Sequence, residues 1–266
     1  MSTKEQKLHA FSKLLDIMDE LREQCPWDKK QTYQTLRHLT IEETYELGDA
    51  ILDNSEEEIK KELGDLLLHI VFYAKIGSEN NSFDIADVCE TISEKLIYRH
   101  PHIYPPKDGK IVKVTSEEEV KQNWENLKLK EGKGKKSILE GVPKSLPALV
   151  KASRIQEKVA AVGFEWQNAA QFYNKIDEEL NEFKEEIAKN NTKKSEEEFG
   201  DLLFALINLA RSKNINVENA LEKTNKKFIN RFQFLENEIG KKKQTVSDLP
   251  LDELIDYWKK SKAVFK

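Results

Sequence analysis

The sequence predicts an all-α protein built from two copies of one helical domain, and three observations lead to that prediction. Charged residues make up 34% of the 266 residues, against only 10 Gly and 7 Pro, which is a composition rich in helix formers. All of the prolines lie outside two long blocks, residues 27–100 and 148–249. Each block contains the same five acidic residues, displaced by 136 positions. A displacement shared by five residues indicates a tandem duplication.

The domain boundaries follow from length and local composition. A chain of 266 residues can form two domains of about 100 to 150 residues, each with its own core. The segment between the two blocks is rich in Gly, Lys and Pro, which is typical of a linker. We therefore expect an N-terminal helical domain at 1–130, a linker at 131–147 and a C-terminal helical domain at 148–266.

Each domain is expected to contain four helices. In the first domain, Ser55 followed by Glu58 predicts a capping box after a turn at Asp53 and Asn54. Pro101 ends the third helix, because proline disfavours helical geometry in the residue before it. The expected helices span 36–52, 56–76, 85–98 and 116–130 in the first domain, and 169–188, 195–212, 217–239 and 252–262 in the second. Four helices per domain suggest a four-helix bundle.

The repeated acids follow one pattern, EExxE, then fifteen intervening residues, then ExxD. They are Glu42, Glu43, Glu46, Glu62 and Asp65 in the first domain, and Glu178, Glu179, Glu182, Glu198 and Asp201 in the second. Acids three or four positions apart share one face of a helix. Antiparallel pairing of the two helices in each domain would bring four or five carboxylates together.

Carboxylates packed this closely repel one another unless a cation neutralises them. Sites made only of carboxylate oxygens favour hard ions such as Mg²⁺ or Mn²⁺. The alternative is that the acids form solvated helix faces, and Ser195 with Glu198 alone fits a capping box. Recurrence of the set and the apolar run after Asp65 favour the metal site. Gly64 and Gly200, inside these helices, suggest that the acid-bearing helices approach closely.

Imidazole cannot be part of a site common to both domains. All five histidines, at positions 9, 38, 69, 100 and 102, lie in the first half. A shared zinc site or histidine base is therefore excluded. Neither Glu46 nor Glu62 has His three residues later, which argues against a ferritin-like di-iron bundle.

A second repeated pattern pairs basic with aromatic residues. Each pair is spaced by four positions and so shares a helix face. The pairs are Lys95 with Arg99 and Trp124 with Lys128 in the first domain, and Lys227 with Arg231 and Trp258 with Lys262 in the second. Taken singly, these residues fit exposed ion pairs or core packing. Beside a metal site, cations could bind phosphate oxygens and an indole could cover a base, which suggests a nucleotide polyphosphate.

Over nearly its whole length the sequence resembles the MazG family of nucleoside triphosphate pyrophosphohydrolases in its two-domain form. The motifs that carry the resemblance in the first half are Cys25-Pro-Trp-Asp28, Thr40-Ile-Glu-Glu-Thr-Tyr-Glu46, Glu62-Leu-Gly-Asp-Leu-Leu67 and Arg99-His-Pro-His102. In the second half they are Gly141-Val-Pro143, Val162-Gly-Phe164, Trp166, Glu198-Phe-Gly-Asp-Leu-Leu203, Asn225-Lys-Lys-Phe228 and Arg231.

The resemblance implies an all-α fold completed by homodimerisation and an Mg²⁺-dependent hydrolysis of nucleoside triphosphates to monophosphate and pyrophosphate. It assigns the metal to Glu179, Glu182, Glu198 and Asp201, and to Glu43, Glu46, Glu62 and Asp65 in the first domain. The attacking water is assigned to Glu178 and, in the first domain, Glu42. The nucleotide is assigned to Lys227, Arg231, Trp258 and Lys262, with Lys95, Arg99, Trp124 and Lys128 as the first-domain set. Because the family's established site is the C-terminal one, the second set ranks first.

The remaining features limit the partners and the setting. A net charge of −5 argues against direct nucleic-acid binding. The N-terminus lacks a signal-peptide core and no apolar run has the roughly 20 residues of a membrane span, so we expect a cytoplasmic protein. Two cysteines, Cys25 and Cys89, exclude a disulfide framework. The expected partners are nucleoside triphosphates and a second copy of the chain, with no protein partner identified.

Two other function classes remain open. The chain could be a helical regulatory protein that binds nucleotide without turnover, or a structural scaffold, for which Mg²⁺ and nucleotide would not change the melting temperature. The two domains also differ, since Trp27 lies 15 residues before Glu42 but Trp166 only 12 before Glu178. The two pockets need not share a substrate or both be active, and the base preference is not predicted.

Overall fold

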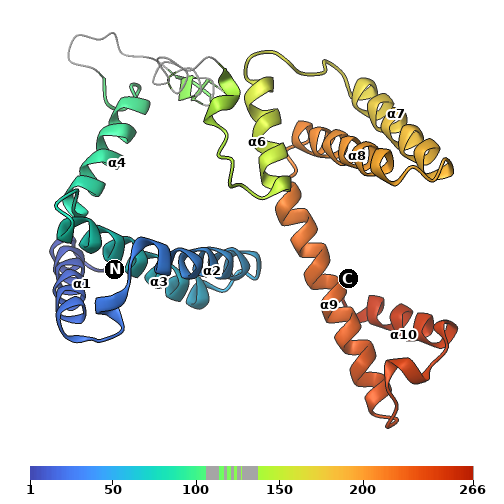
Figure 1. Ribbon diagram of the computed structural model, residues 1–266, viewed down its shortest axis with the longest axis horizontal. Helices are drawn as coiled ribbons and strands as arrows, with labels where there is room; N and C mark the ends of the chain where they lie inside the picture. The colour runs from blue at the N-terminus through green and yellow to red at the C-terminus, as the bar shows by residue number, and fades with distance from the viewer. Residues whose placement is uncertain (106–113, 117–118, 121–122, 125–126, 128–136, 266) are drawn as a thin grey trace. The chain divides into compact units, whose positions relative to one another are not determined.

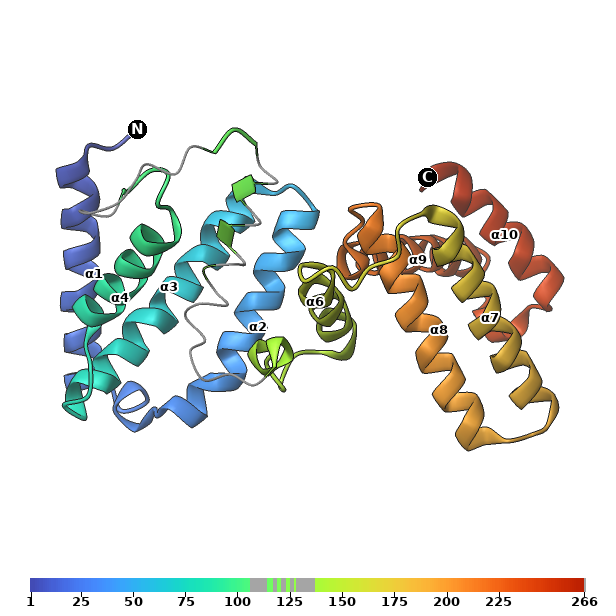
Figure 2. The same ribbon diagram turned by 90° about the horizontal axis from the view of Figure 1, so that it is seen from above.

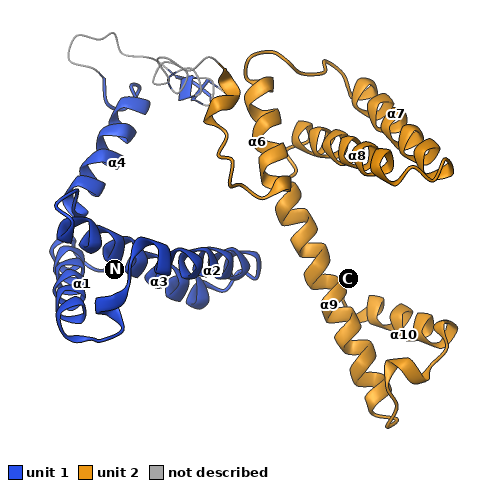
Figure 3. Ribbon diagram, in the orientation of Figure 1, with its two compact units in different colours: residues 1–127 blue, residues 128–266 orange. Residues whose placement is uncertain are grey.

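The computed structural model describes residues 1–105, 114–116, 119–120, 123–124, 127 and 137–265, and every regular element among them is a helix. The predicted all-α class is therefore confirmed. The chain forms two compact units, residues 1–127 and 128–266, which are described separately (Figure 3). In the described ranges no helix combines the length and the apolar character needed to cross a membrane.

The first unit is organised around one central helix. Its helices are α1 (Lys4–Gln24), α2 (Tyr33–Leu52), α3 (Glu56–Glu79) and α4 (Ile85–Arg99), with a short 3-10 helix at Asp28–Lys30. Helix α3 contacts α1, α2 and α4, and Figure 2 shows α2 running alongside α3. The core consists of Met18, Leu36, Val71, Phe72 and Ile76. Burial of each such side chain stabilises the fold by about 1.5 to 3 kcal/mol.

The turn between the two acid-bearing helices is the same in both units. In the first, Asn54 has a left-handed backbone with φ of 54°, and Ser55 accepts a hydrogen bond from the Glu58 amide at the start of α3. In the second, Asn190 has φ of 56° and Asn191 caps α8. Asparagine tolerates this conformation better than other non-glycine residues. The 136-residue displacement therefore extends to the turn that reverses the chain.

The second unit contains α6 (Ala148–Ala160), α7 (Ala169–Ala188), α8 (Thr192–Ser212), α9 (Val217–Gly240) and α10 (Leu251–Val264). Helix α8 contacts α6, α7 and α9, whereas α10 packs on α9. Leu235 and Ile239 of α9 form a separate core with Tyr257 of α10. Figure 1 shows α9 leading away from the α7–α8 pair and carrying α10 at its far end.

Several expectations about the helices require correction. Helices α1 and α6 were not among the expected elements, and most of the expected helix at 116–130 lies outside the described residues. Ser195 is buried inside α8 and does not cap it, since the cap is Asn191. Ser55 caps α3, but the Glu58 side chain pairs with Lys61, so no reciprocal capping box forms.

The expected role of two glycines in close helix packing is wrong. A Cβ atom added at Gly64 or at Gly200 would meet no atom within 4 Å in the described part of the chain. The close approach occurs at Gly77 instead, where a Cβ would lie 2.6 Å from the Phe83 carbonyl oxygen. Gly77 therefore allows the turn between α3 and α4 to pack directly onto α3.

Candidate active site

The acids of the second repeat converge between α7 and α8. One carboxylate oxygen from each of Glu179, Glu198 and Asp201 lies within 4.8 Å of the others, and Glu178, Glu179 and Glu182 form an overlapping group with the same limit. Glu179 belongs to both groups and is only 5% exposed. Helical spacing places three acids on one face of α7, and the Asn190 turn brings α8 against that face.

Lys175 forms ion pairs with two acids of this group. Its Nζ lies 2.6 Å from Glu179 and 2.8 Å from Glu178. Hydrogen bonds to Glu178 and then Glu179 raise the pKa of Lys175, so the ammonium remains charged. Across the cluster, burial and the charges of Glu182, Asp201 and Glu179 raise the pKa of Glu198. Lys175 thus neutralises one side of the cluster while negative charge accumulates on the other.

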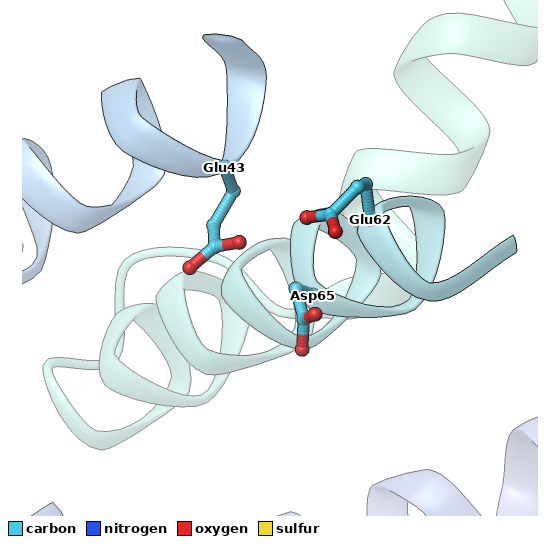
Figure 4. Close-up of side chains that lie close together, drawn as sticks. All are labelled: Glu43, Glu62 and Asp65. Carbon is cyan, nitrogen blue, oxygen red and sulfur yellow. The ribbon is translucent and has the colours of Figure 1, made fainter. Parts of the chain in front are cut away.

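The first repeat forms a smaller cluster of the same kind. Glu43 of α2 points toward Glu62 and Asp65 of α3 (Figure 4), with ligand oxygens within 4.8 Å of one another. Burial, followed by the charges of Asp65 and other neighbouring acids, raises the pKa of Glu43. One oxygen of Glu62 is buried without a hydrogen-bond partner among the described residues. Glu42 and Glu46 are exposed on α2, and neither belongs to the close group.

The two clusters differ at the position that supplies a lysine partner to the acids of the second. The position equivalent to Lys175, 136 residues earlier, is Leu39, which packs against the core of the first unit. Burial and then the charges of Glu46 and Asp65 also raise the pKa of Glu62. The first cluster therefore has no ammonium in the place where the second has Lys175.

A cavity of about 390 Å³ lies beside the second cluster. Its wall includes two of the cluster acids together with residues from α6, α7, α8 and the loop before α7. The other lining residues include Gln156, Phe164, Trp166, Phe172, Phe204 and Asn208. Trp166 was already noted as part of a motif, but Gln156, Asn208 and Lys175 were not predicted. Lys175 could have been found from its spacing to the repeated acids, whereas Gln156 lies on a helix that the sequence pattern did not reveal.

The basic and aromatic residues of the second repeat form their own group on α9 and α10. The rings of Phe228 and Trp258 lie 5.0 Å apart, and Arg231 donates two hydrogen bonds to the Phe265 carbonyl oxygen, at 2.9 and 2.6 Å. Lys227 and Lys262 are exposed on these helices. None of the four predicted nucleotide residues lines the cavity, and α10 lies away from α7 and α8 in Figure 1. These residues were predicted to surround the nucleotide, and within one chain they lie on helices that do not line the cavity beside the acids.

The corresponding group of the first repeat is only partly described. Lys95 and Arg99 lie on α4, and the Arg99 guanidinium lies 5.3 Å from the centre of the Trp124 ring. Lys128 is outside the described residues. The rings of His100 and Trp124 also contact each other, at 5.1 Å between their centres.

Both acidic clusters lie in segments that match one known protein family. Residues 31–104 and 167–233 each match the MazG nucleotide pyrophosphohydrolase domain. The chain belongs to the MazG family. The matched segments contain all ten repeated acids together with the Lys95–Arg99 and Lys227–Arg231 pairs, whereas Gln156 and the Trp258–Lys262 pair lie outside them.

Full-length relatives support the same assignment to the family. A Thermotoga maritima protein named nucleoside triphosphate pyrophosphohydrolase/pyrophosphatase MazG is 43% identical over 255 residues, covering 95% of each chain. An Escherichia coli K12 protein named nucleoside triphosphate pyrophosphohydrolase is 39% identical over 262 residues, covering 96% of this chain and 98% of the relative. The uncharacterised Bacillus subtilis protein YabN is 42% identical over 268 residues, covering 97% of this chain and 53% of YabN. The family is one of hydrolytic enzymes.

Proposed function

We propose that the chain hydrolyses nucleoside triphosphates between the α- and β-phosphates, releasing a nucleoside monophosphate and pyrophosphate with Mg²⁺ as cofactor and Mn²⁺ as a substitute. The observation that carries the proposal is the convergence of Glu179, Glu198 and Asp201 within 4.8 Å beside a 390 Å³ cavity. The names of the T. maritima and E. coli relatives support the substrate class.

The donor set fits a hard divalent ion. Among the described residues, the metal-ligand atoms that converge in each cluster are all carboxylate oxygens, which Mg²⁺ and Mn²⁺ prefer. The raised pKa of Glu198 follows in part from the charges of neighbouring acids, and a cation would relieve that repulsion. Glu179, Glu182, Glu198 and Asp201 would hold the ion. When bound, it would neutralise phosphate charge and lower the pKa of water.

The chain's own residues supply the remaining roles. Glu178 is exposed at the edge of the cluster and is the candidate to orient the attacking water and accept its proton. Lys175 reaches both Glu178 and Glu179 and also lines the cavity. Its ammonium could stabilise the charge that develops on the α-phosphate when the substrate replaces one of these contacts.

We propose that the α9–α10 group reaches the acids from a second copy of the chain. Lys227, Arg231, Trp258 and Lys262 lie together on the helices that lead away from α7 and α8. Helix α8 also exposes Phe199, Leu203 and Leu206, whose spacing places them on one apolar face that an oligomer would cover. We therefore include a homodimer in the proposal, in which this group from one copy neutralises the phosphates held at the acids of the other.

The second repeat is proposed as the dominant site. Its acids have both a lysine partner and an adjacent cavity, whereas the first cluster has Leu39 at the lysine position. Glu42, Glu43, Glu46, Glu62 and Asp65 would form a secondary site for the same ion.

The direct test is product analysis with a panel of ribonucleoside and deoxyribonucleoside triphosphates. We expect equal release of monophosphate and pyrophosphate with Mg²⁺, and none with excess chelator. Release of diphosphate and orthophosphate would contradict cleavage at the α–β bond. If no triphosphate is cleaved but nucleotide with Mg²⁺ raises the melting temperature, the chain is a binding protein without turnover.

A further inference from the structure

The loop between α6 and α7 forms part of the wall of the cavity beside the second cluster. Phe164, Glu165 and Trp166 of this loop line the cavity, as do Glu179 and Asp201, two acids of the proposed metal site. The two aromatic side chains are not held in place by burial, since Phe164 is 81% exposed and Trp166 is 45% exposed. The position of the loop therefore depends on its other contacts.

Hydrogen bonds fix the two ends of the loop but not its middle. At the start, Gly163 has φ of 86°, a conformation that favours glycine, and its amide donates to the Ala160 carbonyl oxygen of α6 at 2.9 Å. At the end, Asn168 caps α7. Within the described ranges, Glu165 and Trp166 make no backbone–backbone hydrogen bond. Only a side-chain contact can then hold the middle of the loop.

Arg211 of α8 supplies that contact. Its Nη2 atom lies 2.5 Å from Glu165 Oε1 and donates a second hydrogen bond of 3.0 Å to Asn208 Oδ1. The Arg211 side chain is 19% exposed, so its charge is largely withdrawn from water and losing its carboxylate partner is unfavourable. One arginine therefore ties the loop to the helix that carries Glu198 and Asp201.

The first unit ties the corresponding loop with a different arginine. Arg22 of α1 donates to the carbonyl oxygens of Asp28 and Gln31, in the segment that leads to α2, and pairs with Glu79 of α3 at 2.5 Å. An arginine thus links this segment to the second acid-bearing helix in both repeats. The position equivalent to Arg211, 136 residues earlier, is not Arg22. Because non-equivalent residues make the two ties, the second tie is not simply inherited from the duplication.

Resting on the proposed function, we propose that Arg211 is a positioning residue for the hydrolysis, which acts through Glu165 by keeping the aromatic loop at the cavity. Phe172 and Phe204 also line the cavity, so its wall beside the acids is largely apolar. An apolar wall lowers the local dielectric constant, which strengthens the interaction of the Lys175 ammonium with charge that develops on the phosphate. The residues assigned to the nucleotide lie on α9 and α10, so loss of the tie should lower kcat and leave KM nearly unchanged.

The test compares Glu165→Gln, Arg211→Met and the double variant of the full-length chain, with Mg²⁺ and the best triphosphate substrate of the wild type. All rates are measured about 15 °C below the lowest melting temperature, so that every variant is folded. Each single variant should lose about tenfold in kcat, with KM within about threefold of wild type. The double variant should lose no more than either single variant, because both substitutions remove the same tie. Arg211→Lys, which keeps a charge that can pair with Glu165, should have a kcat at least about threefold above that of Arg211→Met.

The matched control is Glu157→Gln, which breaks a 2.5 Å pair with Arg154 on α6, in the same unit but outside this cavity. It should keep the wild-type kcat. The positioning role is overturned if Glu165→Gln, a change on an exposed loop, has the wild-type kcat, or if the two single losses multiply in the double variant. It is equally overturned if KM rises while kcat is unchanged, if Arg211→Lys is no better than Arg211→Met, or if Glu157→Gln loses as much as Glu165→Gln. If the wild type cleaves no triphosphate, the proposed function fails and this inference fails with it, whereas an active wild type with unaffected variants refutes this inference alone.

Discussion

Replacing Lys175 with Met should destabilise the metal-free second unit, and the structure indicates by how much. Glu179 is 5% exposed and its carboxylate is 2.6 Å from Lys175 Nζ. Removal of the ammonium leaves a buried carboxylate beside Glu198 and Asp201 without its cation. Losing the partner of a buried charged group costs about 3 to 5 kcal/mol at full burial. Because the lysine side chain itself is 38% exposed, solvent screening reduces the expected loss to about 1 to 3 kcal/mol.

The assay is thermal unfolding of wild type and Lys175→Met in chelator, followed by titration with Mg²⁺. A loss of that size corresponds to a fall of about 3 to 10 °C in melting temperature for a domain of this length. Mg²⁺ should reduce the difference, because an ion bound by the acids would neutralise the same charge and stabilises the folded state by mass action.

The control is Lys259→Met, which breaks an exposed pair with Asp256 and should shift stability by less than about 0.5 kcal/mol. If Lys175→Met melts at the wild-type temperature in chelator, Glu179 does not depend on Lys175 for neutralisation. The interpretation of this lysine as the resident counter-ion of the cluster would then be wrong.

Three further predictions concern pH, backbone packing and assembly. The raised pKa of Glu198 means that its contribution to metal-free stability is largest at low pH and is lost as pH rises through that pKa. In chelator, the wild-type stability minus that of Glu198→Gln should therefore fall as the pH rises above the ordinary carboxyl range, and a flat difference would contradict the shift. In denaturant titrations, Gly77→Ala should lower the free energy of unfolding by about 1 to 3 kcal/mol, because its Cβ would lie 2.6 Å from the Phe83 carbonyl oxygen. The control Gly48→Ala, whose Cβ would meet no atom within 4 Å, should raise it by up to about 1 kcal/mol. Glu179→Gln and Arg231→Met chains, each inactive alone, should regain about a quarter of wild-type activity when mixed in equal amounts, if the two residues act from different copies of a dimer. Half of the dimers are then mixed, and each mixed dimer has one intact site. A mixture that stays inactive would place both residues in the same copy.

The sequence was sufficient for the fold class and for the existence of both acidic clusters, since both depend on local regularities, although Glu42 and Glu46 lie outside the close group of the first cluster. Spacing by three or four positions places Glu179 and Glu182 on one face of α7 whatever surrounds the helix. The repeated turn at Asn54 and Asn190 likewise follows from short-range backbone preferences. These features need no knowledge of distant contacts.

The rest depended on tertiary contacts that spacing does not encode. Gln156 is recognisable as a residue of the cavity wall only from the folded structure, because it lies on a helix that the sequence pattern did not reveal. The glycine prediction was wrong because a helical glycine does not reveal whether anything packs against it, and nothing does at Gly200. The repeated Lys–Arg pair indicated a shared helix face but not the direction in which α9 leaves α8, which Figure 1 shows. The absence of Arg231 from the cavity wall beside the acids was therefore not predictable from spacing.

The most direct test of the central claim is the rate of paired monophosphate and pyrophosphate release, with Mg²⁺, in three variants measured beside wild type. Glu179→Gln removes the acid shared by both groups of the second cluster, Glu43→Gln removes the α2 acid of the first, and Glu185→Gln changes an exposed acid of α7 outside the close groups. We predict a loss of at least about a hundredfold in Glu179→Gln, because an interaction made with the reacting groups is removed. Glu43→Gln should retain most of the activity, and Glu185→Gln should match wild type. Full activity in Glu179→Gln, with loss in Glu43→Gln, would contradict the assignment of hydrolysis to the α7–α8 acids.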